Sequence, residues 1–165
     1  MEGSPCPAKH IVLAEDNSAD VLLVRMALKG AGLHCELRVL DDGEKAVTFI
    51  EALDANEALD ANEAFDANPN VAPIDLLLLD MHLPKRDGEE ILKRLRSSDH
   101  CAKTPVVVMT SSDAPRDHAE AKKHAAIHYF RKPSNLAEFM ELGIIVRDLL
   151  FPNNTCAALR EERGA

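Results

Sequence analysis

A short apolar run, Ile74-Asp-Leu-Leu-Leu-Leu-Asp80, constrains the fold of this chain more than any other feature. A strand with one solvent-exposed face alternates apolar and polar residues, whereas consecutive leucines are typical of a parallel strand that is covered on both faces. Such a strand belongs in the middle of a sheet with helices on both sides. The run ends in Asp80, and a carboxylate in that position is costly unless a cation compensates its charge.

Strand-sized and helical segments alternate along the rest of the chain. Further strands are predicted at 10–14, 35–40, 105–110 and 127–130. Apolar residues at helical spacing predict a helix after each strand, the first ending at Gly30 or Gly32 and the last at Pro152. Five strands alternating with five helices favour an α/β fold with a doubly wound five-stranded parallel sheet, for which the flavodoxin-like strand order is the natural candidate.

One segment interrupts this alternation. The sequence Glu51-Ala-Leu-Asp-Ala-Asn56 is repeated at 57–62 and, with Phe65 in place of Leu, at 63–68. The repeat is rich in helix-forming residues, which indicates an extended second helix or an insertion at about 51–72. Extensions of this kind are well tolerated at a protein surface, so we expect no chemistry from it, with contact to a partner as the alternative.

Length, charge and cysteine spacing limit the classes of function that this chain can have. The 165 residues suffice for one ordinary domain, and the net charge of -9 without a basic stripe excludes a nucleic-acid partner. The four cysteines show no CxxC or CxxH spacing, so neither a zinc site nor a disulfide framework is indicated. Apolar runs fall well short of the about 20 residues that a membrane helix needs, and no signal-peptide core is present, so we expect a cytoplasmic protein without a membrane partner.

Acidic side chains directly follow two of the predicted strands. Glu15 and Asp16 come after the first strand, and Asp80 ends the third. Because functional groups gather at the carboxyl ends of strands in such sheets, these carboxylates should converge, and they repel one another unless a cation lies between them. Mg2+ prefers oxygen ligands of this kind, whereas no nearby Cys or paired His favours zinc. Asp16 and Asn17 have an alternative role as caps of the following helix.

Two further polar groups are expected at the same edge of the sheet. The fourth predicted strand ends in Thr110, and the fifth is followed by Lys132-Pro133. A carboxylate nucleophile, a metal, a hydroxyl and an ammonium are together the parts of an in-line phosphoryl acceptor. Thr110 is by itself a common strand residue and Lys132-Pro133 a common turn, so the prediction depends on the combination.

This combination, in this order and in these strand contexts, resembles the receiver domains of response regulators in two-component systems. The residues that carry the resemblance are Glu15, Asp16, Asp80, Thr110, Lys132 and Pro133. The resemblance covers residues 8–151 as a receiver domain and leaves 152–165 as a tail with no output domain. It implies that Asp80 accepts a phosphoryl group from a sensor histidine kinase, and that the chain is a phosphoacceptor with at most slow self-dephosphorylation rather than an enzyme.

The resemblance also implies a cofactor, Mg2+ or Mn2+. Its ligands would be Asp16, Asp80 and the backbone carbonyl of His82, with Glu15 helping through water. Lys132 would pair with the phosphoryl group. His82 departs from the small or amide residue often found two positions after the phosphoacceptor, which leaves the lifetime of the phosphoryl group open.

By the same resemblance, phosphorylation would bias a bistable surface. Thr110 is similar to the switch hydroxyl, and Tyr129 to the aromatic residue that turns inward when Thr110 moves. The readout face would comprise the fourth helix, fifth strand and fifth helix, where a second copy could bind as a homodimer. The segments Leu83–Gly88 and Lys132–Leu136 resemble phytochrome-associated response regulators more specifically, which implies a bacteriophytochrome as the kinase.

Two other functions stay open. A Mg2+-dependent phosphatase of the haloacid dehalogenase type also uses an Asp nucleophile after a strand, but it needs a second Asp as general acid where this chain has His82, and it usually needs a cap domain. A phosphate-independent pseudo-receiver would keep the fold without the switch. Steady turnover of a phosphomonoester would indicate the phosphatase, and the absence of any response to beryllofluoride would indicate the pseudo-receiver.

Overall fold

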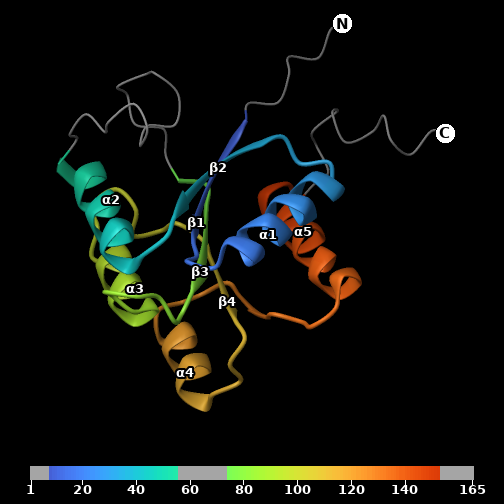
Figure 1. Cartoon of the computed structure of the whole chain (residues 1–165). Helices are drawn as coiled ribbons and strands as arrows, with labels where there is room; N and C mark the ends of the chain where they lie inside the picture. The colour runs from blue at the N-terminus through green and yellow to red at the C-terminus, as the bar shows by residue number, and fades with distance from the viewer. Residues whose placement is uncertain (1–7, 56–73, 153–165) are drawn as a thin grey trace, which may run out of the picture.

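The computed structural model describes residues 8–55 and 74–152, which form a parallel sheet between two layers of helices (Figure 1). The elements follow one another as β1 (Lys9–Ala14), α1 (Ser18–Gly30), β2 (Cys35–Leu40), α2 (Gly43–Ala55), β3 (Leu76–Asp80), α3 (Gly88–Arg96), β4 (Val106–Thr110), α4 (Pro115–Lys123), β5 (His128–Arg131) and α5 (Leu136–Leu150). All pairings are parallel, in the order β2-β1-β3-β4-β5. This confirms the doubly wound, flavodoxin-like α/β fold.

Strand burial follows position in the sheet. Every residue of β3 and of β4 is buried, whereas the outer strands β2 and β5 are mostly half-buried or exposed. The leucine run therefore occupies the sheet centre, as its composition predicts. The structure begins β3 at Leu76 rather than at Ile74, although the Asp75 N–H already donates to the carbonyl of His10 in β1.

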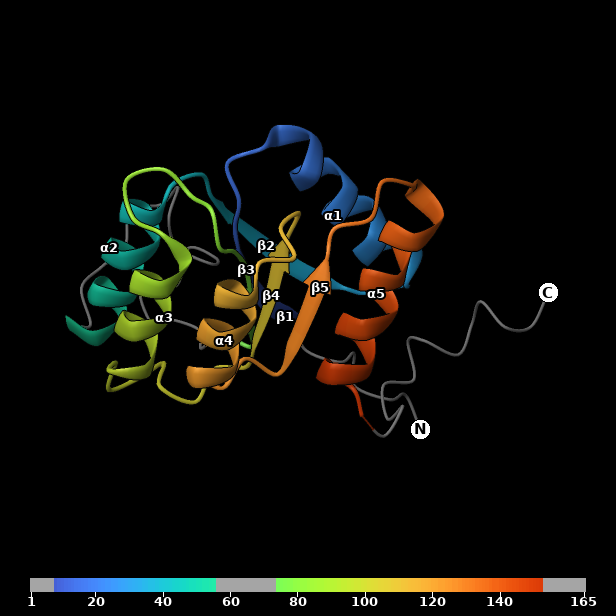
Figure 2. The ribbon, with the colours of Figure 1, turned by 90° about the horizontal axis from the view of Figure 1, so that it is seen from below.

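The helices divide between the two faces of the sheet (Figure 2). Helices α2, α3 and α4 cover one face, and α1 and α5 pack against each other on the second. The contact between α1 and α5 requires glycine at position 143, because an added Cβ would lie 2.0 Å from the carbonyl oxygen of Ala27.

Local chemistry explains where several helices begin. Asn17 caps α1 by accepting from the backbone N–H groups of Ala19 and Asp20, and Asp87 forms a capping box with Glu90 at the start of α3. Pro115 stands in the first turn of α4, where its missing N–H costs nothing. The first helix ends at Gly30, one of the two predicted positions.

Helix α2 ends at Ala55 in the part of the chain that the structure describes. The predicted extension through the hexapeptide repeat falls on residues 56–73, which lie outside the described residues. Within 8–55 and 74–152, none of the helices combines the length and the apolar character that crossing a membrane requires.

Candidate functional site

Three carboxylates meet at the carboxyl edge of the sheet. Strands β1 and β3 are neighbours, with Ala14 opposite Leu79, so the residues that follow them emerge side by side. One oxygen each from Glu15, Asp16 and Asp80 lies within 4.8 Å of the others. The structure thus brings together the three carboxylates that the sequence places at these strand ends.

The ammonium of Lys132 contacts two of these carboxylates and that of Asp20. Its Nζ donates to Glu15 Oε2 at 2.6 Å, to Asp20 Oδ2 at 2.8 Å and to Asp80 Oδ2 at 2.8 Å, and the side chain is only 8% exposed. Burial alone would lower the pKa of Lys132, but the bonds to the three carboxylates outweigh it and raise the pKa above its ordinary value. The ammonium therefore stays charged at neutral pH.

We call Glu15, Asp16, Asp20 and Asp80 the acidic cluster. Glu15 is almost wholly buried, and its Oε1 accepts from the N–H of Asn17. Burial raises the pKa of Glu15 to about 7, against the lowering effect of its bond from Lys132. Three of the four carboxylates pair with the one ammonium, and Asp16 lies beside two of them, so the cluster holds an excess of negative charge that a divalent cation would neutralise.

The donor set of the acidic cluster fits a hard cation. The three residues whose oxygens lie together, Glu15, Asp16 and Asp80, all offer carboxylate oxygens, which suits Mg2+ or Mn2+ better than zinc. Asp16 is exposed, and the cap of α1 is formed by Asn17 rather than by Asp16. The capping role considered for Asp16 is therefore filled by its neighbour, and the Asp16 carboxylate lies beside those of Glu15 and Asp80.

Asp80 is held through both of its carboxylate oxygens. Oδ1 accepts from the backbone N–H of His82 at 2.8 Å, and Oδ2 accepts from Lys132. The His82 ring is mostly exposed, and its Nε2 lies 2.8 Å from Asp117 Oδ2 in the first turn of α4. Asp80 is thus fixed in orientation at the end of a buried strand.

Thr110 lies one residue beyond Met109, the residue opposite Asp80 in the β3–β4 pairing. The Thr110 side chain is fully buried, and Oγ1 accepts from the N–H of Ser112 at 3.1 Å. Its carbonyl accepts from the backbone N–H of Lys132 at 2.8 Å, so β4 positions the segment that carries the lysine.

Tyr129 is a residue of β5, and its side chain contacts α4. Its hydroxyl donates to the Ser112 carbonyl at 3.1 Å, and its ring stacks on His118 of α4 with centroids 3.7 Å apart. The ring is half-buried and packs against the core on the α4 side of the sheet. The Ser112 segment therefore connects the Thr110 hydroxyl with the Tyr129 phenol.

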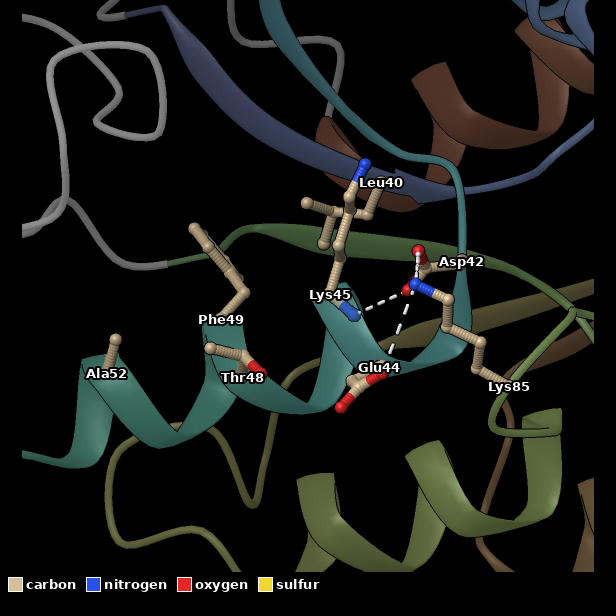
Figure 3. Close-up of a pocket in the computed structure, with 8 residues that line it drawn as sticks. All are labelled: Leu40, Asp42, Glu44, Lys45, Thr48, Phe49, Ala52 and Lys85. Atoms are coloured by element: carbon tan, nitrogen blue, oxygen red, sulfur yellow. Dashed lines mark hydrogen bonds and ion pairs between the residues drawn. The ribbon is translucent and has the colours of Figure 1, made fainter.

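The loop between β3 and α3 is tied to the start of α2, next to a hollow of about 260 Å³ (Figure 3). Lys85, which has a φ of 70°, places Nζ 3.1 Å from Asp42 Oδ2, and the Gly43 N–H donates to the carbonyl of Pro84. A Cβ on Gly43 would lie 1.9 Å from the Arg86 carbonyl oxygen, so only glycine permits this approach. These contacts fix the loop that follows Asp80.

Sequence reasoning missed Asp20 and Asp117 as parts of this region. Asp20 stands in the first turn of α1, where an acidic residue is usually explained by the helix dipole. A signal was nevertheless present, because Asp20 shares a helix face with the buried residues Val24, Ala27 and Leu28. The contact between Asp117 and His82 has no comparable signal, since it depends on where α4 packs.

Comparison with known proteins defines the class of protein to which this site belongs. The model of the response regulator receiver domain family matches residues 11–142, so the chain belongs to this family. Receiver domains of this kind are phosphorylated by histidine kinases and bind a divalent metal ion. Neither the phosphatase nor the pseudo-receiver alternative is favoured by this membership.

Within the family, the chain is similar to response regulators of phytochrome systems. It is 32% identical to the response regulator Rcp1 of Synechocystis sp., over 86% of this chain and 88% of that protein. Among solved structures, the phosphorylated cyanobacterial phytochrome response regulator RcpA matches with a TM-score of 0.73 and 27% identity, over 92% of this chain and 99% of the other. The Mn2+-bound form of Rcp1 matches with a TM-score of 0.68 and 29% identity, over 85% and 92%.

Proposed function

We propose that this receiver accepts a phosphoryl group on Asp80, with Mg2+ or Mn2+ as cofactor, from a sensor histidine kinase. The observation that carries the proposal is the position of the Asp80 carboxylate, which ends a buried strand, accepts from Lys132 and lies within 4.8 Å of oxygens of Glu15 and Asp16. A nucleophile, a metal-binding group and a fixed ammonium therefore occupy one small volume.

Each residue of the site has a separate role in the proposed phosphoryl transfer. The metal ion would be held by Asp16, Asp80 and the backbone carbonyl of His82, with Glu15 assisting through water. The ion would supply positive charge to the phosphoryl oxygens. An Asp80 oxygen attacks phosphorus as the bond to the kinase histidine breaks. Lys132, already bonded to Asp80, pairs with a phosphoryl oxygen, and Thr110 reorients its hydroxyl toward another. The product is an acyl phosphate that the chain itself hydrolyses slowly at most.

The partner proposed is a bacteriophytochrome or a related phytochrome kinase. The support is the similarity to Rcp1 and RcpA, both response regulators, the second named for a phytochrome. A further similar structure is the bacteriophytochrome response regulator AtBRR, at 28% identity and a TM-score of 0.64. Residues 8–151 would constitute the receiver in this proposal.

The readout proposed is the face of α4, β5 and α5, through which two copies would associate. Its support is the position of β5 at the edge of the sheet and the exposure of two large apolar residues, Ile127 at 54% and Leu136 at 51%. Tyr129 lies on this face and would change its packing when Thr110 turns toward the phosphoryl group.

Phosphotransfer tests the proposal directly. Incubation with acetyl phosphate, or with an autophosphorylated phytochrome kinase, should label the wild-type protein only when Mg2+ or Mn2+ is present. Asp80→Asn should abolish labelling, because the amide removes the nucleophilic oxygen but retains the shape of the side chain. Asp113→Asn, a change of the same chemistry in an exposed loop, should be labelled normally. Labelling of Asp80→Asn at the wild-type level would refute the assignment of the phosphoacceptor.

A further inference from the structure

His82 makes two hydrogen bonds that lead to different parts of the molecule. Its backbone N–H donates to Asp80 Oδ1, and its ring Nε2 lies 2.8 Å from Asp117 Oδ2. Because a carboxylate only accepts, the imidazole must donate its Nε2–H in this contact. One residue therefore links the carboxylate of Asp80 to the first turn of α4.

Helix α4 buries few of its residues. Of its nine residues, from Pro115 to Lys123, only Asp117 and Ala121 are buried, and its N-cap residue Ala114 forms no side-chain cap. The side chain of Asp117 is 11% exposed, whereas that of His82 is 59% exposed. A helix with one small buried apolar residue depends on its polar contacts more than the other helices do, so the bond to His82 is well placed to set its position.

We propose that the His82–Asp117 pair is a clasp that holds α4 in its resting position and opens when Asp80 is phosphorylated. This inference depends on the proposed function of Asp80. Phosphorylation converts the carboxylate into an acyl phosphate, so Oδ1 loses negative charge and accepts less strongly from the His82 N–H. A phosphoryl group with a charge of about -2 also appears beside His82, where it competes with Asp117 for the Nε2–H. His82 is thus a positioning residue, and it takes no part in the bond changes at phosphorus.

The clasp has a measurable thermodynamic consequence. A contact present only in the resting state opposes phosphorylation, because ligands shift a two-state equilibrium by their differential affinity. Cutting the contact should therefore raise the affinity of the protein for beryllofluoride, which mimics the phosphoryl group. Because the His82 side chain is mostly exposed, the contact should contribute no more than an ordinary hydrogen bond, so about a three- to tenfold decrease in the half-saturating concentration is expected.

The experiment compares Asp117→Ala, His82→Ala and the double variant with the wild type, in Mg2+. Tyrosine fluorescence is a local reporter, because Tyr129 is the only tyrosine in the chain, there is no tryptophan, and its ring stacks on His118 of α4. The two single substitutions remove groups of opposite electrostatic character. A simple charge effect would shift the two half-saturating concentrations in opposite directions, whereas the clasp predicts that both fall by a similar factor and that the double variant falls no further.

Two controls separate the clasp from general loosening of α4. Arg116→Ala removes an ion pair between the same turn of α4 and Glu89 of α3, which has no link to Asp80, and should leave the half-saturating concentration unchanged. Asp117→Asn keeps an oxygen that can accept from His82 and should behave nearly as the wild type. Because the His82 ring is mostly exposed, His82→Ala should fold even if Asp117→Ala does not.

The outcomes of the clasp test are distinct from those of the phosphotransfer test. Unchanged, increased or opposite half-saturating concentrations in the alanine variants would overturn the clasp and leave the phosphoacceptor assignment intact. A wild-type protein that shows no response to beryllofluoride would instead overturn the proposed function, and the clasp with it.

Discussion

The carboxyl ends of the strands form one edge of the sheet and their amino ends form the other. The negative charges at these two edges are compensated to different extents. At the carboxyl edge, the acidic cluster has four carboxylates but a single ammonium, that of Lys132, which pairs with three of them. At the other edge, where α2 and α3 end, Asp54 accepts from Arg94, the Ser98 hydroxyl and the His100 N–H. Burial would raise the pKa of Asp54, but these bonds outweigh it and lower the pKa to about 2, whereas the pKa of Glu15 is raised to about 7.

The contrast distinguishes a structural charge from a functional one. Asp54 has donors on both oxygens, so its ionised form is favoured by folding and it joins α2 to the end of α3. The acidic cluster is undercompensated, so part of its electrostatic cost is relieved only by an added cation. Conditions that add or remove positive charge should therefore act strongly at the carboxyl edge and weakly at the other.

Removal of the Lys132 ammonium should have the largest effect. Lys132→Ala leaves Glu15, Asp20 and Asp80 without their shared donor, and breaking a buried pair of this kind costs about 3 kcal/mol or more. Urea denaturation in EDTA should show this loss in the free energy of unfolding. Mg2+ should restore part of it, because the ion supplies positive charge to the same oxygens.

A matched control for the Lys132 variant is Lys93→Ala on α3, which removes an exposed i,i+4 pair with Glu89 and should leave the free energy of unfolding nearly unchanged. If Mg2+ restored nothing to Lys132→Ala, the loss would come from packing, and the contrast between the two edges would fail.

Asp54→Ala should have the next largest effect, about 2 kcal/mol of destabilisation, since it leaves the Arg94 guanidinium and the Ser98 hydroxyl without their acceptor. In contrast to Lys132→Ala, the loss should be the same in EDTA and in Mg2+, and labelling by acetyl phosphate should persist in the folded fraction. Abolished labelling in folded Asp54→Ala would show that the two edges are coupled rather than independent.

The same variant has a characteristic dependence on pH. The pKa of Asp54 falls from 3.8 to about 2 on folding, so its contribution to stability is present above about pH 4 and is lost as the pH falls toward 2. The wild-type protein should therefore lose more stability than Asp54→Ala over this acid range. Equal slopes for the two proteins would show that Asp54 is not held in its ionised form.

The sequence predicts the strand ends of this molecule better than the contacts between its side chains. The strands, the sheet centre and the meeting of Glu15, Asp16 and Asp80 follow from local patterns together with the rule that parallel strands share a carboxyl edge. The contacts of Lys132 with Asp20 and of His82 with Asp117 join residues far apart in sequence. They depend on how α1 and α4 pack, which periodicity does not determine.

Arg96 shows the same limit at the opposite edge. Periodicity places it at the end of α3 as an ordinary basic residue, but its guanidinium donates to four backbone carbonyls in the flanking loops, those of Ala102, Thr104, His124 and Ala125. No pattern in the sequence indicates this role, because the acceptors are main-chain atoms that any residue would supply.

Asp16→Asn should have the smallest effect on stability and an opposite sign. It removes one of several mutually repelling carboxylates from an exposed position, so the metal-free protein should gain about 0.5 kcal/mol. The wild-type protein should gain about 1.4 kcal/mol when Mg2+ is raised to ten times its dissociation constant, and Asp16→Asn should lose most of that gain.

Asp20→Asn is the matched control, since Asp20 contacts Lys132 but stands outside the group of three oxygens, and it should keep the response to Mg2+. Thermal unfolding across a Mg2+ series measures both terms, and a full response of Asp16→Asn to the ion would remove Asp16 from the metal site and place the excess charge elsewhere in the cluster.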